Sequence, residues 1–224
     1  RANDPGNALR NYYLVISENK TEFVNRAASR AAEIERQQKN YPKAIRNYQT
    51  VLAQAGNKTD QVTATLGLMD TYYAMGRYDS TQHFAREVLT MGNTVPGAQN
   101  RAQLAMGKVA YAKGDFAKAT QEFEKTLALS KDEFGAEALY WLGDIQYRNK
   151  KYKESIQTLL RFNSEIAEQE YWKGKGFLLV ADNNVALNEL AQARAVLNSI
   201  IENSSIPEIV DEAKQKLTAL DTKN

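Results

Sequence analysis

The segment MGKVAYAKGDFAKATQEFEKTLAL, residues 106–129, decides the fold class of this chain. Apolar or small residues recur three and four positions apart on both sides of Gly114 and Asp115, which is the pattern of two amphipathic helices. Gly114 can adopt the left-handed backbone that ends a helix, and Asp115 is a suitable N-cap for the next one. A helix pair this short cannot bury its apolar faces alone, so it predicts neighbours of the same kind.

The same pattern recurs with a period of about 37 residues. Each predicted pair opens its second helix with a bulky residue, and these are 37, 38, 36 and 38 positions apart: Tyr41, Tyr78, Phe116, Tyr152 and Leu190. A small residue stands three positions after each of them. Nine positions before each of them, where two helices would touch closely, the residue is small except at Met69. Small residues let two backbones approach, so the pattern predicts closely packed helices and an all-α fold.

The periodicity predicts one domain over residues 1–224, an α-solenoid of stacked helix-turn-helix repeats. Five repeats are expected between a half repeat at 5–20 and a capping helix at 207–220: 21–55, 59–92, 97–130, 132–167 and 169–204. The first helix of the first full repeat is expected to begin at Thr21, and the second helix of the fourth to reach about residue 163.

The composition argues against several classes of function. The chain has 224 residues, and its 29 basic and 27 acidic side chains give a net charge of +2. This balance gives no reason to expect a polyanion such as nucleic acid as partner. No run approaches the roughly 18 apolar residues of a membrane helix, so membrane insertion is not expected. The absence of cysteine excludes disulfides and thiolate chemistry and leaves the compartment open.

Patterns typical of catalysis or ligand binding are sparse. His83 is the only histidine, and on its predicted helix a surface or packing role is expected. No His/Cys cluster or Asp-rich loop has the spacing of a metal site. Gly174-Lys175-Gly176 lacks the preceding strand and the third glycine of a phosphate loop, so we interpret it as part of a helix-packing face. We therefore expect no catalytic residue, no cofactor and no metal.

The repeat unit resembles the tetratricopeptide repeat (TPR) family. The resemblance is clearest in GKVAYAKGDFAKATQEFEKTL (Gly107–Leu127) and YWLGDIQYRNKKYKESIQTLL (Tyr140–Leu160), and it extends over most of the chain. The long period, the AEALYWLGD run (Ala136–Asp144) and the final proline-led helix are similar to TPR proteins of the bacterial cell envelope, of the Tol–Pal-associated periplasmic and outer-membrane-assembly lipoprotein types. This resemblance implies a right-handed superhelix and a periplasmic or outer-membrane-associated location.

In that family the first helices of the repeats line the concave side, so their shared face is a candidate binding groove. Its predicted members lie at offsets that place them on one helical face, and we call them the predicted groove: Tyr73, Tyr111, Tyr140, Tyr147, Asp70, Lys108, Asp144 and Arg148. Tyrosines offer large contact area with few rotamers to restrict, and the charged residues would orient a peptide or helix. The alternative is that the tyrosines pack against the neighbouring pair and the carboxylates are solvated.

The sequence thus predicts a non-catalytic scaffold or adaptor for protein–protein interaction, in a bacterial envelope assembly. The alternative is the repeat module of a larger multidomain enzyme or regulator whose active domain is not in this chain. The opening of the chain midway through a repeat favours that alternative. A receptor for a small signalling peptide is a third interpretation. The half repeat at 5–20 could also stack on another copy, which predicts self-association.

Overall fold

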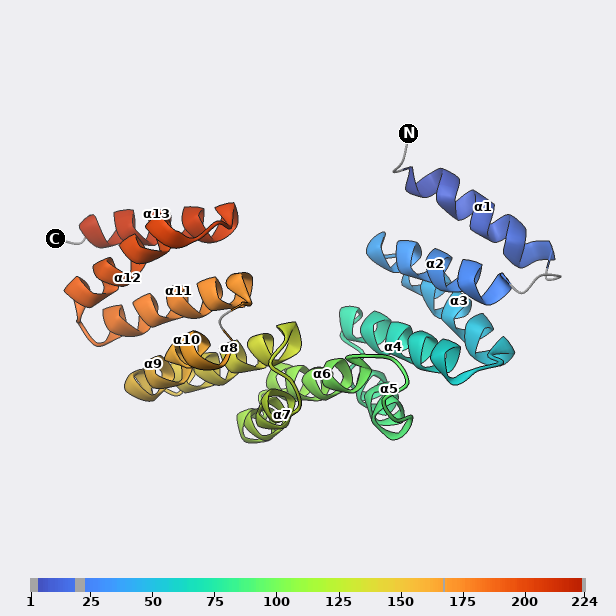
Figure 1. Cartoon of the computed structure of the whole chain (residues 1–224), viewed down its shortest axis with the longest axis horizontal. Coiled ribbons are helices and arrows are strands. Elements are labelled where there is room, and N and C mark those ends of the chain that lie inside the picture. Colours follow the sequence, from blue (N-terminus) through green and yellow to red (C-terminus); the bar gives the residue numbers. More distant parts are fainter. Residues whose placement is uncertain (1–3, 19–22, 167, 223–224) are drawn as a thin grey trace. The chain divides into compact units, whose positions relative to one another are not determined.

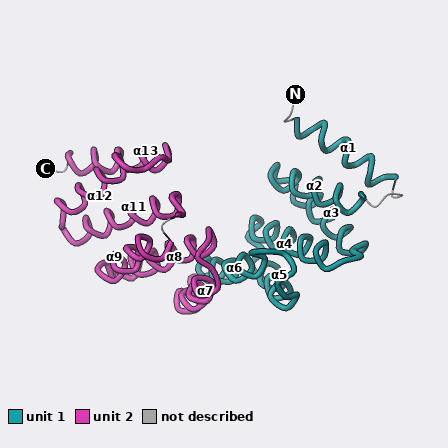
Figure 2. Tube along the Cα trace, in the orientation of Figure 1, with its two compact units in different colours: residues 1–113 teal, residues 114–224 magenta. Residues whose placement is uncertain are grey.

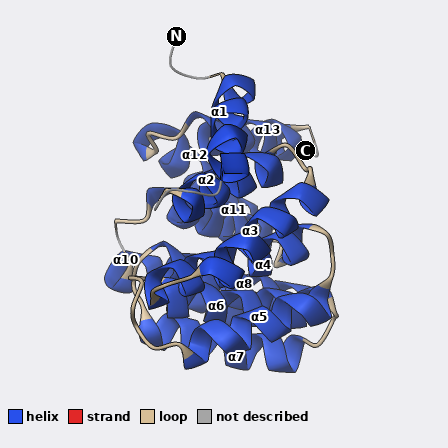
Figure 3. Ribbon diagram, turned by 90° about the vertical axis from the view of Figure 1, so that its right-hand side faces the viewer, coloured by secondary structure: helices blue, strands red, loops and turns tan. Residues whose placement is uncertain are grey.

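The computed structural model describes residues 4–18, 23–166 and 168–222, and all regular structure within them is helical (Figures 1 and 3). The prediction of an all-α solenoid is confirmed. The predicted helix start at Thr21 and the end of the fourth repeat at residue 167 lie outside the described residues. Among the described helices, none is long and apolar enough to cross a membrane.

The chain divides into two compact units, residues 1–113 (unit 1) and 114–224 (unit 2) (Figure 2). Unit 1 contains α1 (Pro5–Glu18), α2 (Val24–Gln37), α3 (Tyr41–Gln54), α4 (Lys58–Ala74), α5 (Tyr78–Thr90) and α6 (Ala98–Ala112). Unit 2 contains α7 (Phe116–Leu129), α8 (Glu133–Arg148), α9 (Tyr152–Leu160), α10 (Phe162–Glu165), α11 (Glu170–Ala186), α12 (Leu190–Asn203) and α13 (Pro207–Asp221). The prediction of a single domain with its repeat boundaries stays a prediction.

Within each unit, alternate helices form a continuous row. In unit 1, α4 packs against both α2 and α6, and in unit 2, α11 packs against both α8 and α13. The rows α2–α4–α6 and α8–α11–α13 consist of the helices that the sequence places first in each repeat, followed by the capping helix. Each row therefore carries its own part of the predicted groove.

The turn between the two helices of a pair is built in the same way in every repeat. One residue, two positions before each bulky opening residue, has positive φ, with values of 63°, 69°, 77°, 58° and 61° at Lys39, Gly76, Gly114, Lys150 and Asn188. The next backbone N–H then reaches back over the helix end; that of Lys151, for example, donates to the carbonyl of Gln146 at 2.9 Å. After Gly114, Asp115 caps α7 by accepting from the Lys118 backbone N–H, as predicted.

Glycines in the first helices accept bulky side chains from second helices. A methyl group added at Gly67 would lie 2.2 Å from the Tyr48 ring, and one added at Gly143 would lie 2.5 Å from Leu159 Cδ2. Gly176 receives the ring of the fully buried Phe162 in the same way, at 2.7 Å. The interpretation of Gly174-Lys175-Gly176 as a packing segment is thereby supported.

The second helix of the fourth repeat differs from the prediction. It ends at Leu160 instead of about residue 163, and the short α10 follows after a break at Arg161. The Arg161 side chain donates to Glu165 Oε1 at 2.7 Å, and Phe162 is fully buried against Gly176. Burial of this ring is a tertiary contact that helical periodicity does not report.

We expect Lys150→Gly to stabilise the protein by about 0.5–1 kcal/mol. A non-glycine residue in the left-handed region costs about 1–2 kcal/mol, and the greater freedom of glycine in the unfolded chain offsets only part of this gain. The matched control is Lys214→Gly in the interior of α13, which should destabilise by about 1 kcal/mol because glycine is a poor helix former. Urea unfolding of both variants measures the difference, and equal effects at the two sites would contradict the proposed strain.

Candidate functional site

The unit 1 part of the predicted groove lies on α4 and α6. Asp70 forms an ion pair with Arg101 of α6, and Lys108 Nζ stands 5.3 Å from the centre of the Tyr73 ring. Tyr111 lies on α6 three positions after Lys108 and, like Tyr73, is half-buried. Two interactions therefore connect α4 and α6 in this unit: the ion pair of Asp70 and the contact of Lys108 with the Tyr73 ring.

Two carboxylates of unit 1 have pKa values shifted in opposite directions. Burial raises the pKa of Asp70 above its usual value, although Arg101 and Arg36 attract its charged form. Burial also acts to raise the pKa of Glu33, but hydrogen bonds and attraction from Arg36, with hydrogen bonds from Gln37 and Tyr48, lower it overall. The Arg36–Glu33 pair is 2.7 Å long.

The unit 2 part of the predicted groove lies on α8. Asp144 is buried and accepts from Arg148 Nε at 2.7 Å. The Tyr147 ring lies 5.6 Å from that of Tyr152, and burial raises the pKa values of Tyr147 and Tyr140. Asp144 is therefore buried and ion-paired. The alternative interpretation had assumed that the groove carboxylates are simply solvated, and this does not hold for Asp144.

The predicted groove residues are divided four and four between the two units. Several carboxylates of the two rows have a cation as partner, among them Glu33 with Arg36, Asp70 with Arg101, Asp144 with Arg148, and Asp182 with Lys216. The face is thus a set of fixed ion pairs among half-buried tyrosines. The prediction that all eight residues form one groove stays a prediction.

The sequence analysis missed the two tryptophans of this region. The Tyr140 ring lies 5.3 Å from that of Trp141 and 5.5 Å from that of Trp172 on α11. Trp141 donates from Nε1 to Glu137 Oε1 at 3.1 Å. No other repeat has a tryptophan at the position equivalent to Trp141 or Trp172, so a comparison of equivalent positions between repeats does not select these residues. The available signal was the presence of both on predicted first helices.

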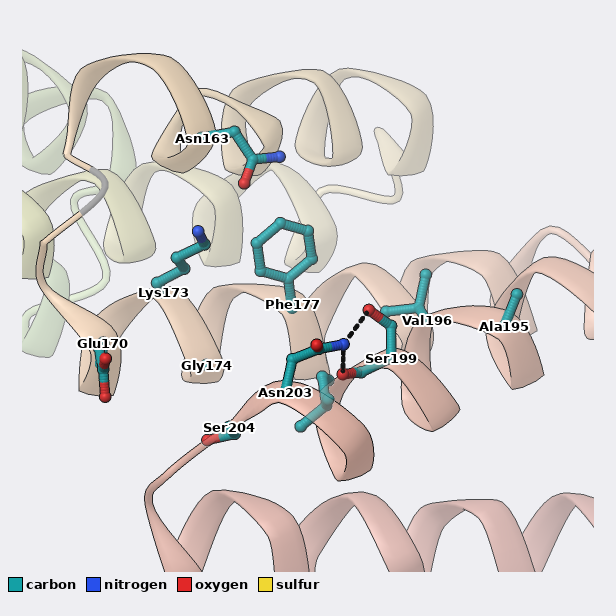
Figure 4. A pocket seen from close by; sticks show the side chains of 11 residues that line it. Asn163, Glu170, Lys173, Gly174, Phe177, Ala195, Val196, Ser199, Asn203 and Ser204 are labelled. Atoms are coloured by element: carbon teal, nitrogen blue, oxygen red, sulfur yellow. Dashed lines mark hydrogen bonds between the residues drawn. The ribbon is translucent and has the colours of Figure 1, made fainter.

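A pocket of 580 Å³ lies within unit 2 between α11 and α12 (Figure 4). The ring of Phe177 and the side chain of Lys173 line it on the α11 side. On the α12 side, Asn203 donates to the Ser199 carbonyl at 2.8 Å. The pocket combines an apolar ring with an ammonium group and amides, and none of its lining residues belongs to the predicted groove.

His83 lies on α5 with 65% of its side chain exposed. Its Nε2 is 3.4 Å from Glu87, and its ring meets that of Phe84 edge-on at 5.0 Å. These are surface contacts, which agrees with the surface or packing role expected from the sequence.

Comparison with known proteins relates this geometry to a repeat family. Residues 104–164 match the family model described as tetratricopeptide repeat. The match supports the TPR family. It includes six of the eight predicted groove residues and the segments that carry the resemblance seen in the sequence. The TPR fold is commonly a protein–protein interaction module.

Among solved structures, a tetratricopeptide repeat protein from Parabacteroides merdae ATCC 43184 is similar to this chain. The two share 15% sequence identity with a TM-score of 0.69, and the match covers 98% of this chain and 81% of the other. At this identity the likeness establishes the TPR fold alone. No curated protein sequence matches the chain.

We expect Asp70→Asn and Glu33→Gln to have opposite pH dependence. A carboxyl whose folded pKa is raised opposes folding once the pH exceeds its ordinary value of 3.8, so Asp70→Asn should cost less free energy of unfolding near pH 7 than near pH 3. Glu33 has a folded pKa below its ordinary 4.5, so it stabilises the fold above that value and loses this contribution as the pH falls through the lowered pKa. Glu33→Gln should therefore cost more near pH 7. Urea unfolding at both pH values tests this, and slopes of the same sign would contradict it.

Proposed function

We propose that this chain is a non-catalytic scaffold that binds a peptide or helix of a partner protein in a concave groove, on the predicted groove face of its first helices. The observation that carries the proposal is the set of half-buried tyrosines on α4, α6 and α8, fixed among ion pairs. Tyr73 has Lys108 over its ring, and Arg148 holds Asp144. Side chains already held in place lose little freedom on binding, so such a face is suited to recognition.

We further propose that the partner belongs to a bacterial envelope assembly, in the periplasm or at the outer membrane. The support is the resemblance of the long period and of the Ala136–Asp144 run to envelope TPR proteins. Fractionation of cells that produce the full-length protein tests this location, and recovery in the cytoplasmic fraction alone would exclude it.

For the binding face, we expect Tyr111→Ala combined with Tyr147→Ala to weaken the partner's affinity at least tenfold. Each truncation removes a large aromatic contact, and such residues contribute most of the energy of many interfaces. The partner is first captured with the full chain, identified by mass spectrometry and purified, and its affinity is then measured by calorimetry.

The matched control replaces two exposed leucines outside the predicted groove, Leu129→Ala and Leu160→Ala, whose exposed fractions are 54% and 44%. This pair should leave the affinity unchanged. If the tyrosine variant keeps its helical circular dichroism and binds as tightly as the control, the proposed face is wrong.

We also propose self-association through α1. This helix has no buried residue, and Leu14 is 55% exposed. The apolar side chains of α1 therefore remain accessible, and a second copy of the chain can pack against them. We expect Leu14→Glu to shift the protein toward the monomer in analytical ultracentrifugation, while Leu129→Glu, at 54% exposure in α7, should leave the distribution unchanged. A monomeric unmodified chain at high concentration would refute self-association.

A further inference from the structure

Five aromatic rings of unit 2 touch in series, and we call them the aromatic strip: Phe123, Trp141, Tyr140, Trp172 and Tyr171. Successive ring centres are 6.4, 5.3, 5.5 and 5.4 Å apart. Phe123 is fully buried on α7, whereas Tyr171 on α11 is 39% exposed. The strip therefore leads from the core to the surface, and α8 and α11 hold its outer rings in place.

The outer end of the strip offers ring surface and a hydrogen-bond donor. Trp172 is half-buried, and its indole N–H donates to no acceptor among residues 4–18, 23–166 and 168–222. Trp141, deeper in the strip, already donates to Glu137. An incoming group can therefore use the Trp172 face and N–H without displacing a bond within the described chain.

The surroundings of this end are acidic. Unit 2 carries 18 carboxylates against 14 basic side chains, a net charge of −4. A hollow on α13 is lined by Glu208, Asp211 and Glu212, and Lys216 is the one cation among its described lining residues. Within the described part of the chain, Glu208 and Asp211 have no cationic partner, whereas Glu212 is held by Lys175 at 2.9 Å.

The register of α11 and α13 places Glu208 beside Tyr171. Two ion pairs between these helices follow the same order along both: Lys175 pairs with Glu212, and further along, Asp182 pairs with Lys216 at 2.8 Å. The two helices are therefore parallel, and one turn before Lys175 and Glu212 stand Tyr171 and Glu208. Lys173 lines the pocket between α11 and α12 (Figure 4). Lys175 lies within electrostatic reach of Tyr140 and Tyr171, and Glu212 holds its charge in an ion pair.

We propose that the outer end of the aromatic strip, formed by Trp172 and Tyr171 with Glu208, is a docking site for a basic segment of a partner protein. A lysine or arginine of that segment stacks on the Trp172 ring and forms an ion pair with Glu208. Tryptophan is the best cation–π acceptor among the side chains, and the negative charge of unit 2 attracts such a segment. This assignment rests on the proposed function, because it names the chemistry of the partner on the same row of helices.

The two tryptophans of the chain, Trp141 and Trp172, both lie in the strip, so intrinsic fluorescence reports on it directly. In a Trp141→Phe background, Trp172 is the single tryptophan, and long-wavelength excitation selects its emission over that of the 12 tyrosines. Titration of this full-length variant with an amidated hexa-arginine peptide should give a saturable change in emission that weakens as salt is raised. A hexa-glutamate peptide should give none.

Two substitutions with a matched control locate the site. Glu208→Gln should weaken hexa-arginine binding about threefold to fivefold, and Trp172→Ala should weaken it at least fivefold, measured with a labelled peptide by fluorescence anisotropy. Glu154→Gln is the control, because Glu154 is also a first-turn glutamate of unit 2, on α9. It changes the net charge equally and should leave the affinity unchanged.

An equal loss in Glu208→Gln and Glu154→Gln would reveal unspecific charge attraction and overturn the proposal. So would the absence of a saturable signal, or binding of hexa-glutamate. If hexa-arginine fails to bind while the captured partner still depends on Tyr111 and Tyr147, this inference fails and the proposed function stands. If hexa-arginine binds through Trp172 but the tyrosine variant keeps its partner, the proposed groove fails instead.

Discussion

Two helices can share a core only where their backbones come close, and in this protein a glycine on one helix receives a bulky side chain from another. Tyr48 fills the space at Gly67 in unit 1, and Leu159 fills that at Gly143 in unit 2. Tyr48 and Leu159 occupy the same position of the repeat, seven residues after Tyr41 and Tyr152. A side chain larger than hydrogen at either glycine would have to displace a buried partner, so this contact fixes the spacing of the helices.

This close packing determines what the outer face of each row can offer. The second helices pack against one side of the first helices. Only the opposite side of the first helices is therefore available for polar and aromatic groups. On that side, carboxylates are held by cations from the same helix, as in Asp144–Arg148, or from the next helix of the row, as in Asp70–Arg101 and Lys216–Asp182. The ion pairs between helices thus fix the side chains of the face and join adjacent helices.

The charge of the whole chain conceals a difference between its units. The net charge of +2 gave no reason to expect a polyanion as partner, but unit 1 has 15 basic and 9 acidic side chains, while unit 2 has 14 and 18. A sum over the chain cancels these opposite values. Because salt screens charges beyond a Debye length of about 8–10 Å, a partner bound to one face experiences the charges near that face and not the sum over the chain.

The sequence by itself determined the helix pairs, the turn positions and the all-α class, because amphipathic period and turn chemistry are local properties of the chain. Residue type alone does not reveal the backbone conformation of every turn. Lys39, Lys150 and Asn188 adopt the left-handed conformation that is typical of glycine, because the repeat requires it at that position. Only the tertiary structure decided which side chains meet across helices. Tyr140 and Trp172 are 32 positions apart and Asp70 and Arg101 are 31 apart, so neither pair follows the 37-residue period. Such contacts depend on how neighbouring helices cross and stack, which is decided by the packing of the core and not by the spacing of residues on a single helix.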